Sequence, residues 1–414
     1  MAHVAWTRMV WLAALLILVL VVCGCEGNDD DDDAGDDDVA GDDDAAGDDD
    51  SGDDDDQGDP FYPPDQLGPY AVGVTTMCFV DESRYEIWGN RKRLVPLEIW
   101  YPSTGAGGRP NLMPEMIGMM PEAVWGIMEL LYGDNFEPLM AYVTDALREA
   151  EIQVAAEPWP VIFFSHGLNA VRFQNFTMCE YLASHGFIVA APDHYGNAIF
   201  TNDPFSEDVI LVNPTTVVTS FIDTVTDIGF VYDRLAELNV EPGGRFEGLL
   251  DLSRCGMTGH SYGGMTTLNA APQYDFIDAI APLNPAYVGV FPEDFDKPFF
   301  LVQGRKDGVV GFFVPDVEIL WNENESTQKI YLDMYRAGHY SVTDACLLLP
   351  PGMIPDSATG CSGDEFIDGE LANALNAAYL TAFFKTTIAD EQGYVDYMLT
   401  NHAPEEIDLK LIWQ

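Results

Sequence analysis

Short apolar runs alternate with longer amphipathic segments along most of the chain. The apolar runs have strand length, and they cover residues 94–102, 161–167, 187–193, 255–261, 276–284, 298–304 and 329–335. Amphipathic spacing predicts helices over 171–185, along 221–235, from Tyr262 onward and over 367–386. Strands that alternate with helices of ten or more residues indicate one α/β domain with a mainly parallel central sheet flanked by helices.

One segment, residues 111–156, departs from this alternation. It is rich in methionine and aromatic residues, and its pattern predicts two short helices. Such a helical insertion could simply cover the core. It could also form a lid or wall for an apolar ligand, since methionine surfaces adapt to varied shapes.

The first residues have the pattern of a processing signal. Arg8 precedes twelve apolar residues, 11–22, too few for a spanning helix of about 20. The sequence Val-Cys-Gly-Cys at 22–25 resembles a bacterial lipobox, which predicts cleavage after residue 24 and lipidation of Cys25. An ordinary secretory signal or a short anchor is the alternative.

Residues 25–59 are predicted to be a disordered tether that begins at the lipidated cysteine. From residue 28 onward the segment consists almost entirely of Asp, Gly and Ala, so it cannot offset its ordering entropy by burial. Like charges extend such a chain. Calcium binding is the rival interpretation, but the run lacks the D-x-D-x-D-G spacing that wraps one ion.

The charge of the remainder limits its partners. The formal net charge is −51, and residues 1–59 account for −19 of it through 19 Asp, Glu26 and Arg8, which leaves −32 for residues 60–414. So acidic a domain is not expected to bind nucleic acid or to steer an anionic substrate. We expect residues 60–414 to form the catalytic domain.

The cysteines suggest one disulfide and no metal site. Cys346 and Cys361 bracket a Pro/Gly-rich loop and are the best candidates for a disulfide in an exported protein. No C-x-x-C pair or histidine cluster suggests a metal.

The stretch Thr258–Gly264 has the form G-x-S-x-G around Ser261. A predicted buried strand enters it and a predicted helix leaves it, which is the context of a nucleophile elbow. A purely structural glycine turn is the alternative. Serine needs a base to take its proton, and in this architecture the acid and the histidine follow the serine in the chain.

Two residues after Ser261 fit these roles. His339 lies in a loop after the strand 329–335, whereas His402 lies in a polar tail. Asp307 follows the strand 298–304 and would orient His339, with Asp296 as a weaker candidate.

The oxyanion that develops during acyl transfer is stabilised by two N–H donors that are in position before the reaction starts. The backbone N–H of Tyr262, directly after the serine, would be one donor. The second would be the N–H of Leu168 in the loop "SHGLN" after the strand that begins at residue 161. His166 in that loop and His260 beside the serine are interpreted as structural rather than catalytic.

Three blocks carry a family resemblance: residues 161–194, "VIFFSHGLNAVRFQNFTMCEYLASHGFIVAAPDH", residues 227–239 and residues 252–264. They resemble the platelet-activating-factor acetylhydrolase-like branch of the α/β-hydrolases over roughly residues 70–385. The resemblance implies an α/β-hydrolase fold that hydrolyses carboxylic esters of lipids or other apolar acyl groups without a cofactor. It departs from the eukaryotic acetylhydrolases at Asn284, where those enzymes carry their acid.

The sequence therefore predicts an esterase or lipase anchored by lipid to the bacterial cell envelope, on the outer membrane or the cell surface. A polyester or cutinase-type hydrolase has the same machinery. A prolyl-oligopeptidase-like peptidase also shares "SYGG", and a non-catalytic surface-binding module could keep the fold. The oligomeric state stays open.

Overall fold

The computed structural model describes residues 61–86, 91–118, 120–203, 208–211, 220–286, 295–311, 314–350, 352 and 359–414. Tyr62–Gln414 form one compact unit. The predicted signal peptide (1–24), Cys25 and the aspartate-rich tether (25–59) lie outside the described residues. Those assignments stay predictions.

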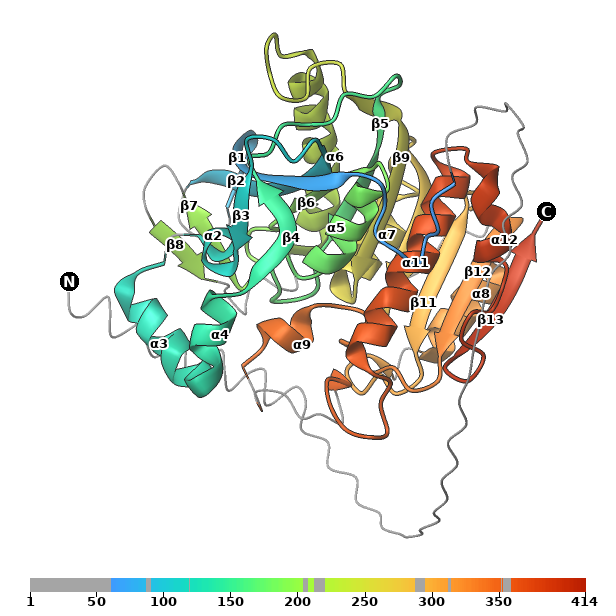
Figure 1. Ribbon diagram of the computed structural model, residues 1–414. Helices are drawn as coiled ribbons and strands as arrows, with labels where there is room; N and C mark the ends of the chain where they lie inside the picture. Colours follow the sequence, from blue (N-terminus) through green and yellow to red (C-terminus); the bar gives the residue numbers. More distant parts are fainter. Residues whose placement is uncertain are drawn as a thin grey trace, which may run out of the picture. The chain divides into compact units, whose positions relative to one another are not determined.

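An eleven-stranded sheet forms the centre of this unit (Figure 1). Its strands follow the order β13-β12-β11-β10-β9-β5-β6-β2-β1-β4-β3. Their bounds, in chain order, are β1 Ala71–Tyr85, β2 Lys92–Ser103, β3 Arg109–Leu112, β4 Val143–Arg148, β5 Trp159–Ser165, β6 Ile188–Pro192, β9 Leu250–His260, β10 Ile277–Leu283, β11 Phe299–Gly304, β12 Gln328–Met334 and β13 Ile407–Trp413. A separate hairpin pairs β7 (Phe200–Asp203) with β8 (Asp208–Leu211).

The six central strands, from β12 through β5 to β6, run parallel, as the apolar runs predicted. Antiparallel pairing appears towards the two ends of the sheet, between β13 and β12 on one side and among β6, β2 and β1 on the other. The sheet is therefore mixed, with a parallel centre.

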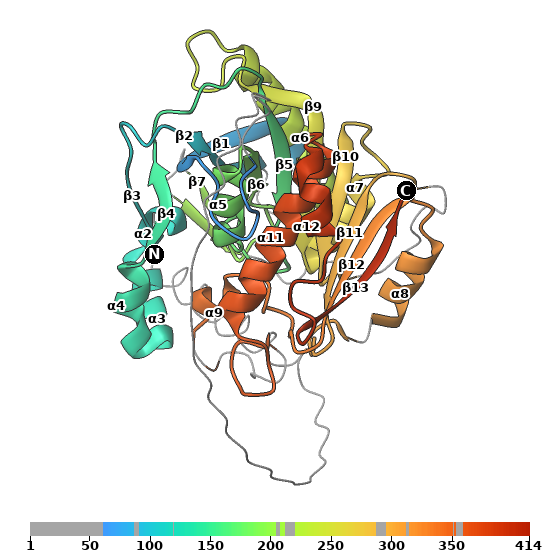
Figure 2. The same cartoon turned by 45° about the vertical axis from the view of Figure 1, so that its right-hand side comes forward.

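Helices cover both faces of the sheet, and each face has its own core (Figure 2). On one face lie α5 (Phe176–Ser184) and α11 (Gly369–Thr387), and on the other lie α6 (Ser220–Val240), α7 (Tyr262–Ala270) and α8 (Val314–Glu323). Side chains of β5 alternate between the two cores: Ile162 and Phe164 pack with α5 and α11, and Val161 and Phe163 with the other group. Because both faces are buried, the strand is apolar throughout rather than alternating.

The methionine-rich segment lies at the β3–β4 end of the sheet and holds more helix than expected. It contains α2 (Met113–Ile117), α3 (Glu122–Tyr132), the 3₁₀ turn η1 (Gly133–Asn135) and α4 (Phe136–Met140), placed between β3 and β4. Met113 and Met116 are fully buried in the core, so the first helix covers the core. Helix α3 is only partly buried.

The hydrophobic pattern missed several elements, among them β1, α8 and the C-terminal strand, and it placed the start of α5 too early. The C-terminal residues form the edge strand β13, which pairs with β12 over seven residues. Only Ile407 of this strand is fully buried, so an edge position gives no clear apolar run. Helix α5 begins at Phe176 rather than 171, since residues before it form turns that lead to the carboxyl end of β5.

Short helical elements also occur towards the C-terminus. They are α9 (Ala345–Leu348), η3 (Gln392–Tyr394) and α12 (Val395–Met398).

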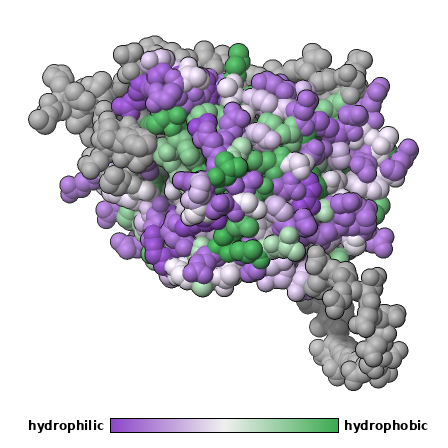
Figure 3. Space-filling view, turned by 90° about the horizontal axis from the view of Figure 1, so that it is seen from above, coloured by the Kyte–Doolittle hydropathy of each residue, from purple (hydrophilic) through white to green (hydrophobic). Residues whose placement is uncertain are grey.

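Viewed from above, the surface is mostly hydrophilic and its apolar side chains gather in separate small patches (Figure 3). Within the described ranges, no helix combines the length and the apolar character needed to cross a membrane.

Candidate active site

The predicted site residues converge because they follow parallel strands. Strands β9, β10, β11 and β12 end in register at one edge of the sheet, with His260 beside Leu283, Leu283 beside Val302 and Gly304 beside Met334. The residues that follow these strands therefore emerge at the same edge. They include Ser261, Asn284, Asp307 and His339.

Ser261 occupies a sharp turn between β9 and α7. Its backbone has φ 56° and ψ −115°, a conformation that costs free energy for a non-glycine residue. A side chain at Gly263 would place its Cβ 1.9 Å from the carbonyl oxygen of Ser165, and one at Gly259 would lie 2.4 Å from that of Gly263. The two glycines of the motif are therefore required by close backbone packing, as a nucleophile elbow predicts.

His339 and Asp307 form a buried hydrogen-bonded pair. Nδ1 of His339 lies 2.7 Å from Oδ2 of Asp307, and Oδ1 accepts hydrogen bonds from the N–H groups of Val309 and Val310. Burial by itself raises the pKa of Asp307, but the nearby His339 ring and these backbone donors lower it overall. The carboxylate thus stays ionised and holds the proton of the imidazole on Nδ1.

The chain directly before Ser261 contacts the loop that carries His339. Nε2 of His260 donates to the carbonyl oxygen of His339 at 2.8 Å, so the residue before the serine is tied to the histidine loop. Among the described contacts, no hydrogen bond joins the Ser261 hydroxyl to the His339 ring. Ser261 keeps 8% of its surface exposed, whereas Ser165 on the neighbouring strand has none. Catalytic hydrogen bonds are often long in the absence of substrate.

The loop proposed to supply Leu168 lies beside the serine. A Cβ placed on Gly167 would be 3.4 Å from Nδ1 of His260. The side chain of Gln174 connects the two, because its Oε1 accepts from the Gly167 N–H and its Nε2 lies 2.7 Å from Nδ1 of His260. No described group accepts a hydrogen bond from the Leu168 N–H. The assignment of Leu168 and Tyr262 as oxyanion donors stays a prediction.

The rival histidines and acid lie elsewhere. His402 stacks on Tyr397 and bonds to its carbonyl oxygen. Asp296 is exposed, and none of the described contacts links it to His339. Burial and the neighbouring His339 lower the pKa of His260 to about 3, so this ring is neutral and both of its nitrogens are bonded.

Asn284 is a site residue whose role the sequence did not reveal. Its Nδ2 donates to the carbonyl oxygen of His339 at 2.9 Å, and its Oδ1 accepts from the Gly304 N–H at 2.7 Å. It therefore joins the ends of β10 and β11 to the histidine loop. The signals in the sequence were its place at the end of a predicted strand and at the position where the resembling acetylhydrolases carry their acid.

The expected disulfide is present. Cys346 and Cys361 are bonded, with their Cα atoms 5.2 Å apart. The bridge closes a loop that packs on the histidine turn, since the Cα of Gly360 lies 2.5 Å from where a Cβ of Gly338 would be. Cys179 and Cys255 are buried free thiols. In the described ranges, no group of three or more His, Cys, Asp or Glu side chains could hold a metal ion.

This arrangement defines an α/β-hydrolase fold, and comparison with known proteins agrees. Residues 61–210 match the profile of the family described as platelet-activating factor acetylhydrolase, isoform II. A solved ferulic acid esterase from Streptomyces cinnamoneus has the same fold, with a TM-score of 0.64 and 24% identity over 78% of this chain and 91% of that one.

Two curated relatives are similar to about a third of this chain. YitV of Bacillus subtilis, a protein assigned only provisionally as an esterase, is 28% identical over 33% of this chain. Platelet-activating factor acetylhydrolase of Cavia porcellus is 30% identical over 31% of this chain. The chain spans 49% of the first relative's length and 27% of the second's. The expected resemblance to acetylhydrolase-like esterases is thereby confirmed.

Proposed function

We propose that this protein is a serine hydrolase that cleaves carboxylic esters of lipid-like or other apolar acyl groups. One observation carries the proposal. Ser261 stands on a strained strand-to-helix turn at the sheet edge where the bonded His339–Asp307 pair also emerges. That combination serves acyl transfer through an acyl-enzyme.

The reaction would proceed in two halves. Oγ of Ser261 attacks the acyl carbon while Nε2 of His339 takes its proton, and the imidazolium is stabilised by Asp307. The N–H groups of Leu168 and Tyr262 bind the oxyanion. The C–O bond then breaks and His339 returns the proton to the leaving alcohol. Water repeats the sequence, with His339 as base, and releases the acid and free Ser261.

An apolar substrate fits the surroundings of the site. Helix α3 carries Trp125 and Met128, which pack against the core while staying partly exposed. The hydroxyl of Tyr132, at the end of this helix, bonds to the carbonyl oxygen of Leu348 in the chain that follows His339. We propose α3 as a wall of the acyl site. The strongly acidic composition disfavours anionic substrates.

The test is hydrolysis of p-nitrophenyl esters of increasing chain length by the wild type and by Ser261→Ala. The matched control is Ser253→Ala, a serine on the same strand outside the elbow. The proposal expects kcat to fall by about 10⁴-fold or more only in Ser261→Ala. Retained activity in that variant would remove Ser261 from the mechanism. Cleavage of aliphatic polyester film or of peptide substrates in preference to these esters would redirect the substrate assignment.

We also propose that Cys25 carries the lipid that anchors the protein to the bacterial cell envelope. The lipobox-like residues 22–25 and the aspartate run after them support this. Metabolic labelling with an alkyne fatty acid should mark the wild type and Cys23→Ser but not Cys25→Ser. Equal labelling of both variants would exclude the assignment.

A further inference from the structure

The peptide unit that joins Gly167 to Leu168 is held from several sides. The Gly167 N–H donates to Oε1 of Gln174 at 2.7 Å. Its carbonyl oxygen accepts from Nδ1 of His166 at 2.8 Å and from the Ala170 N–H at 3.2 Å. In a trans peptide the C=O and the following N–H point in opposite directions. Fixing the Gly167 oxygen therefore fixes the direction of the Leu168 N–H.

The ring of His166 is itself fixed by a second backbone contact. Its Nε2 lies 3.0 Å from the N–H of His194 and must accept from it, so the proton of the neutral ring is on Nδ1. That proton is the one donated to Gly167. Burial and the neighbouring His194 lower the pKa of His166 to about 3, which keeps the ring in the neutral form that can donate and accept at once.

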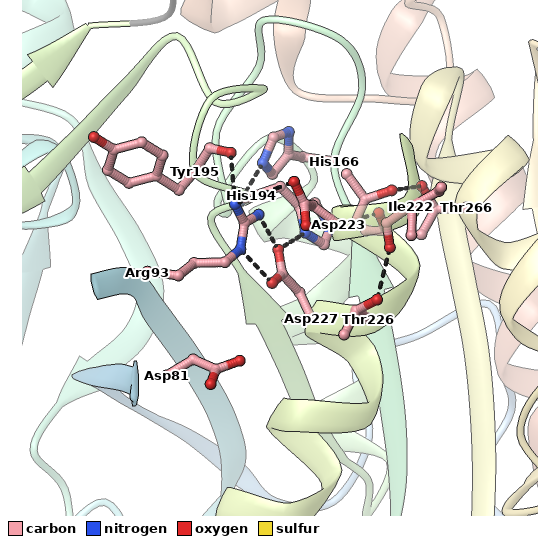
Figure 4. Close-up of polar contacts among 12 residues, drawn as sticks. Asp81, Arg93, His166, His194, Tyr195, Ile222, Asp223, Thr226, Asp227 and Thr266 are labelled. Atoms are coloured by element: carbon pink, nitrogen blue, oxygen red, sulfur yellow. Dashed lines mark hydrogen bonds and ion pairs between the residues drawn. The ribbon is translucent and has the colours of Figure 1, made fainter. Parts of the chain in front are cut away.

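His194 is anchored by a cluster of buried charged groups (Figure 4). Its Nδ1 lies 3.0 Å from Oδ2 of Asp227, and its Nε2 lies 2.8 Å from Oγ of Ser165. Asp227 in turn receives two bonds from Arg93, at 2.7 and 2.6 Å, and one from Arg84 at 2.7 Å. Cations hold this carboxylate ionised, so it can orient the imidazole of His194.

Ser165, His194 and Asp227 thus repeat the contacts of a catalytic triad inside the protein. Ser165 is the last residue of β5 and has no exposed surface, whereas Ser261 has some. A substrate cannot reach Ser165. The chain instead continues directly from Ser165 to His166 and the oxyanion loop, so the cluster acts on that loop.

We propose that His166 is a positioning residue for the oxyanion hole, with its ring set by His194 and by the Asp227 cluster behind it. The inference rests on the proposed function, because the Leu168 N–H matters only if an oxyanion forms at Ser261. Without the His166 donor, only the longer 3.2 Å bond from the Ala170 N–H holds the Gly167 oxygen. The Leu168 N–H is then less firmly directed when charge develops on the substrate oxygen.

Two amide substitutions separate the contacts of the ring. In His166→Asn the amide lies where Nδ1 was and can still donate to the Gly167 oxygen. In His166→Gln the amide reaches the Nε2 position and keeps only the partner at His194. Removal of one oxyanion donor costs about 10²–10³-fold in kcat. We expect His166→Gln to lose about 10²-fold in kcat with KM changed less than about threefold, and His166→Asn to lose less than about tenfold.

A second measurement distinguishes positioning from general damage. An alkyl trifluoromethyl ketone forms a tetrahedral oxyanion with an active serine, whereas the matching secondary alcohol does not. In His166→Gln, inhibition by the ketone should weaken in proportion to kcat/KM, and inhibition by the alcohol should not change. The matched control is His185→Asn, since His185 is another buried neutral histidine, bonded to the Gln66 carbonyl away from the site. It should lower Tm without lowering kcat.

Each of the following results would contradict either the positioning role of His166 or the proposed function. Equal kcat in His166→Gln and His166→Asn, or ketone and alcohol inhibition that weaken together, would overturn the positioning role. Loss of folded protein in His166→Gln but not in His166→Asn, measured by Tm, would assign the ring to stability alone and also overturn it. Full activity of Ser261→Ala would instead overturn the proposed function.

Discussion

Nδ1 of His339 donates a 2.7 Å hydrogen bond to Oδ2 of Asp307, although 32 residues separate the two in the chain. The other carboxylate oxygen of Asp307 accepts hydrogen bonds from two backbone N–H groups, and these bonds hold the carboxylate in one orientation. The pair therefore presents the imidazole in a single tautomer, with Nε2 left free of the proton for its proposed role as base.

Asp307→Asn should reduce kcat by about 10⁴-fold with little change in KM. An amide can donate to Nδ1, which would shift the imidazole proton to Nε2 and remove the base. Stopped-flow and steady-state hydrolysis of a p-nitrophenyl ester would measure this. Asp296→Asn, on an exposed residue, is the matched control and should behave as wild type. A loss below tenfold in Asp307→Asn would mean that another acid orients His339.

Asn284→Asp should not create a second acid. The Asn284 amide donates to the carbonyl oxygens of His339 and Gly338, and a carboxylate would face those oxygens with no proton to donate. We expect a loss of about 1–3 kcal/mol in the free energy of unfolding, measured by urea denaturation. The double variant Asp307→Asn/Asn284→Asp should stay inactive. Recovered activity there would show that position 284 can support His339.

Removal of the disulfide should affect both stability and catalysis. Closure of a 15-residue loop contributes about 3 kcal/mol in the chain-entropy model, and this loop packs against Gly338, next to His339. Cys346→Ala/Cys361→Ala should lower Tm and kcat together, as measured by thermal unfolding and ester hydrolysis. The control is Cys78→Ala, at a cysteine of β1 that is not part of this disulfide. An unchanged kcat at a lowered Tm would separate the disulfide from the histidine turn.

Glu180→Gln should stabilise the protein increasingly as pH rises. Burial, with smaller contributions from Asp145 and Asp344, raises the pKa of Glu180 to about 8. Between about pH 4.5 and 8 the folded state keeps a proton that the unfolded state has lost, so stability falls as pH rises, by about 1.4 kcal/mol per pH unit at most.

The measurement is Tm of the wild type and of Glu180→Gln at pH 5 and at pH 8. The difference between them should be larger at pH 8, because the neutral amide needs no proton. Glu122→Gln, on an exposed residue of α3, should show no such trend. A difference that does not depend on pH would show that Glu180 is not protonated in the folded protein.

Local patterns in the sequence determined the parts of the site that are made locally. The strand, the glycine-flanked Ser261 and the helix from Tyr262 are contiguous, so the elbow could be predicted from the order of residue types. The placement of Asp307 and His339 after strands was also predictable, since parallel strands that follow one another bring their carboxyl ends to one edge. The two cores, one on each face of the sheet, were predictable as well, because parallel strands that are buried on both faces appear in the sequence as continuous apolar runs.

Only the tertiary structure decided which polar side chains meet across the sheet. Asn284 bridges the ends of β10 and β11 to the histidine loop, and its partners lie 20 and 55 residues away in the chain. Asp227 on α6 meets Arg93 on β2 and His194 after β6, and no spacing in the sequence records these distances. Edge strand β13 was likewise missed, because a half-exposed strand has no continuous apolar run.

The physical reason is the distance along the chain over which each kind of interaction acts. Hydrophobic periodicity and turn chemistry act between neighbours in the chain, so they fix strands, helices and the elbow. Buried hydrogen bonds are satisfied by whichever groups the fold brings within 3 Å, and many pairings fit the same composition. The sequence by itself therefore determined the local setting of Ser261. The packed sheet decided which groups support His339 and which hold the Gly167–Leu168 peptide.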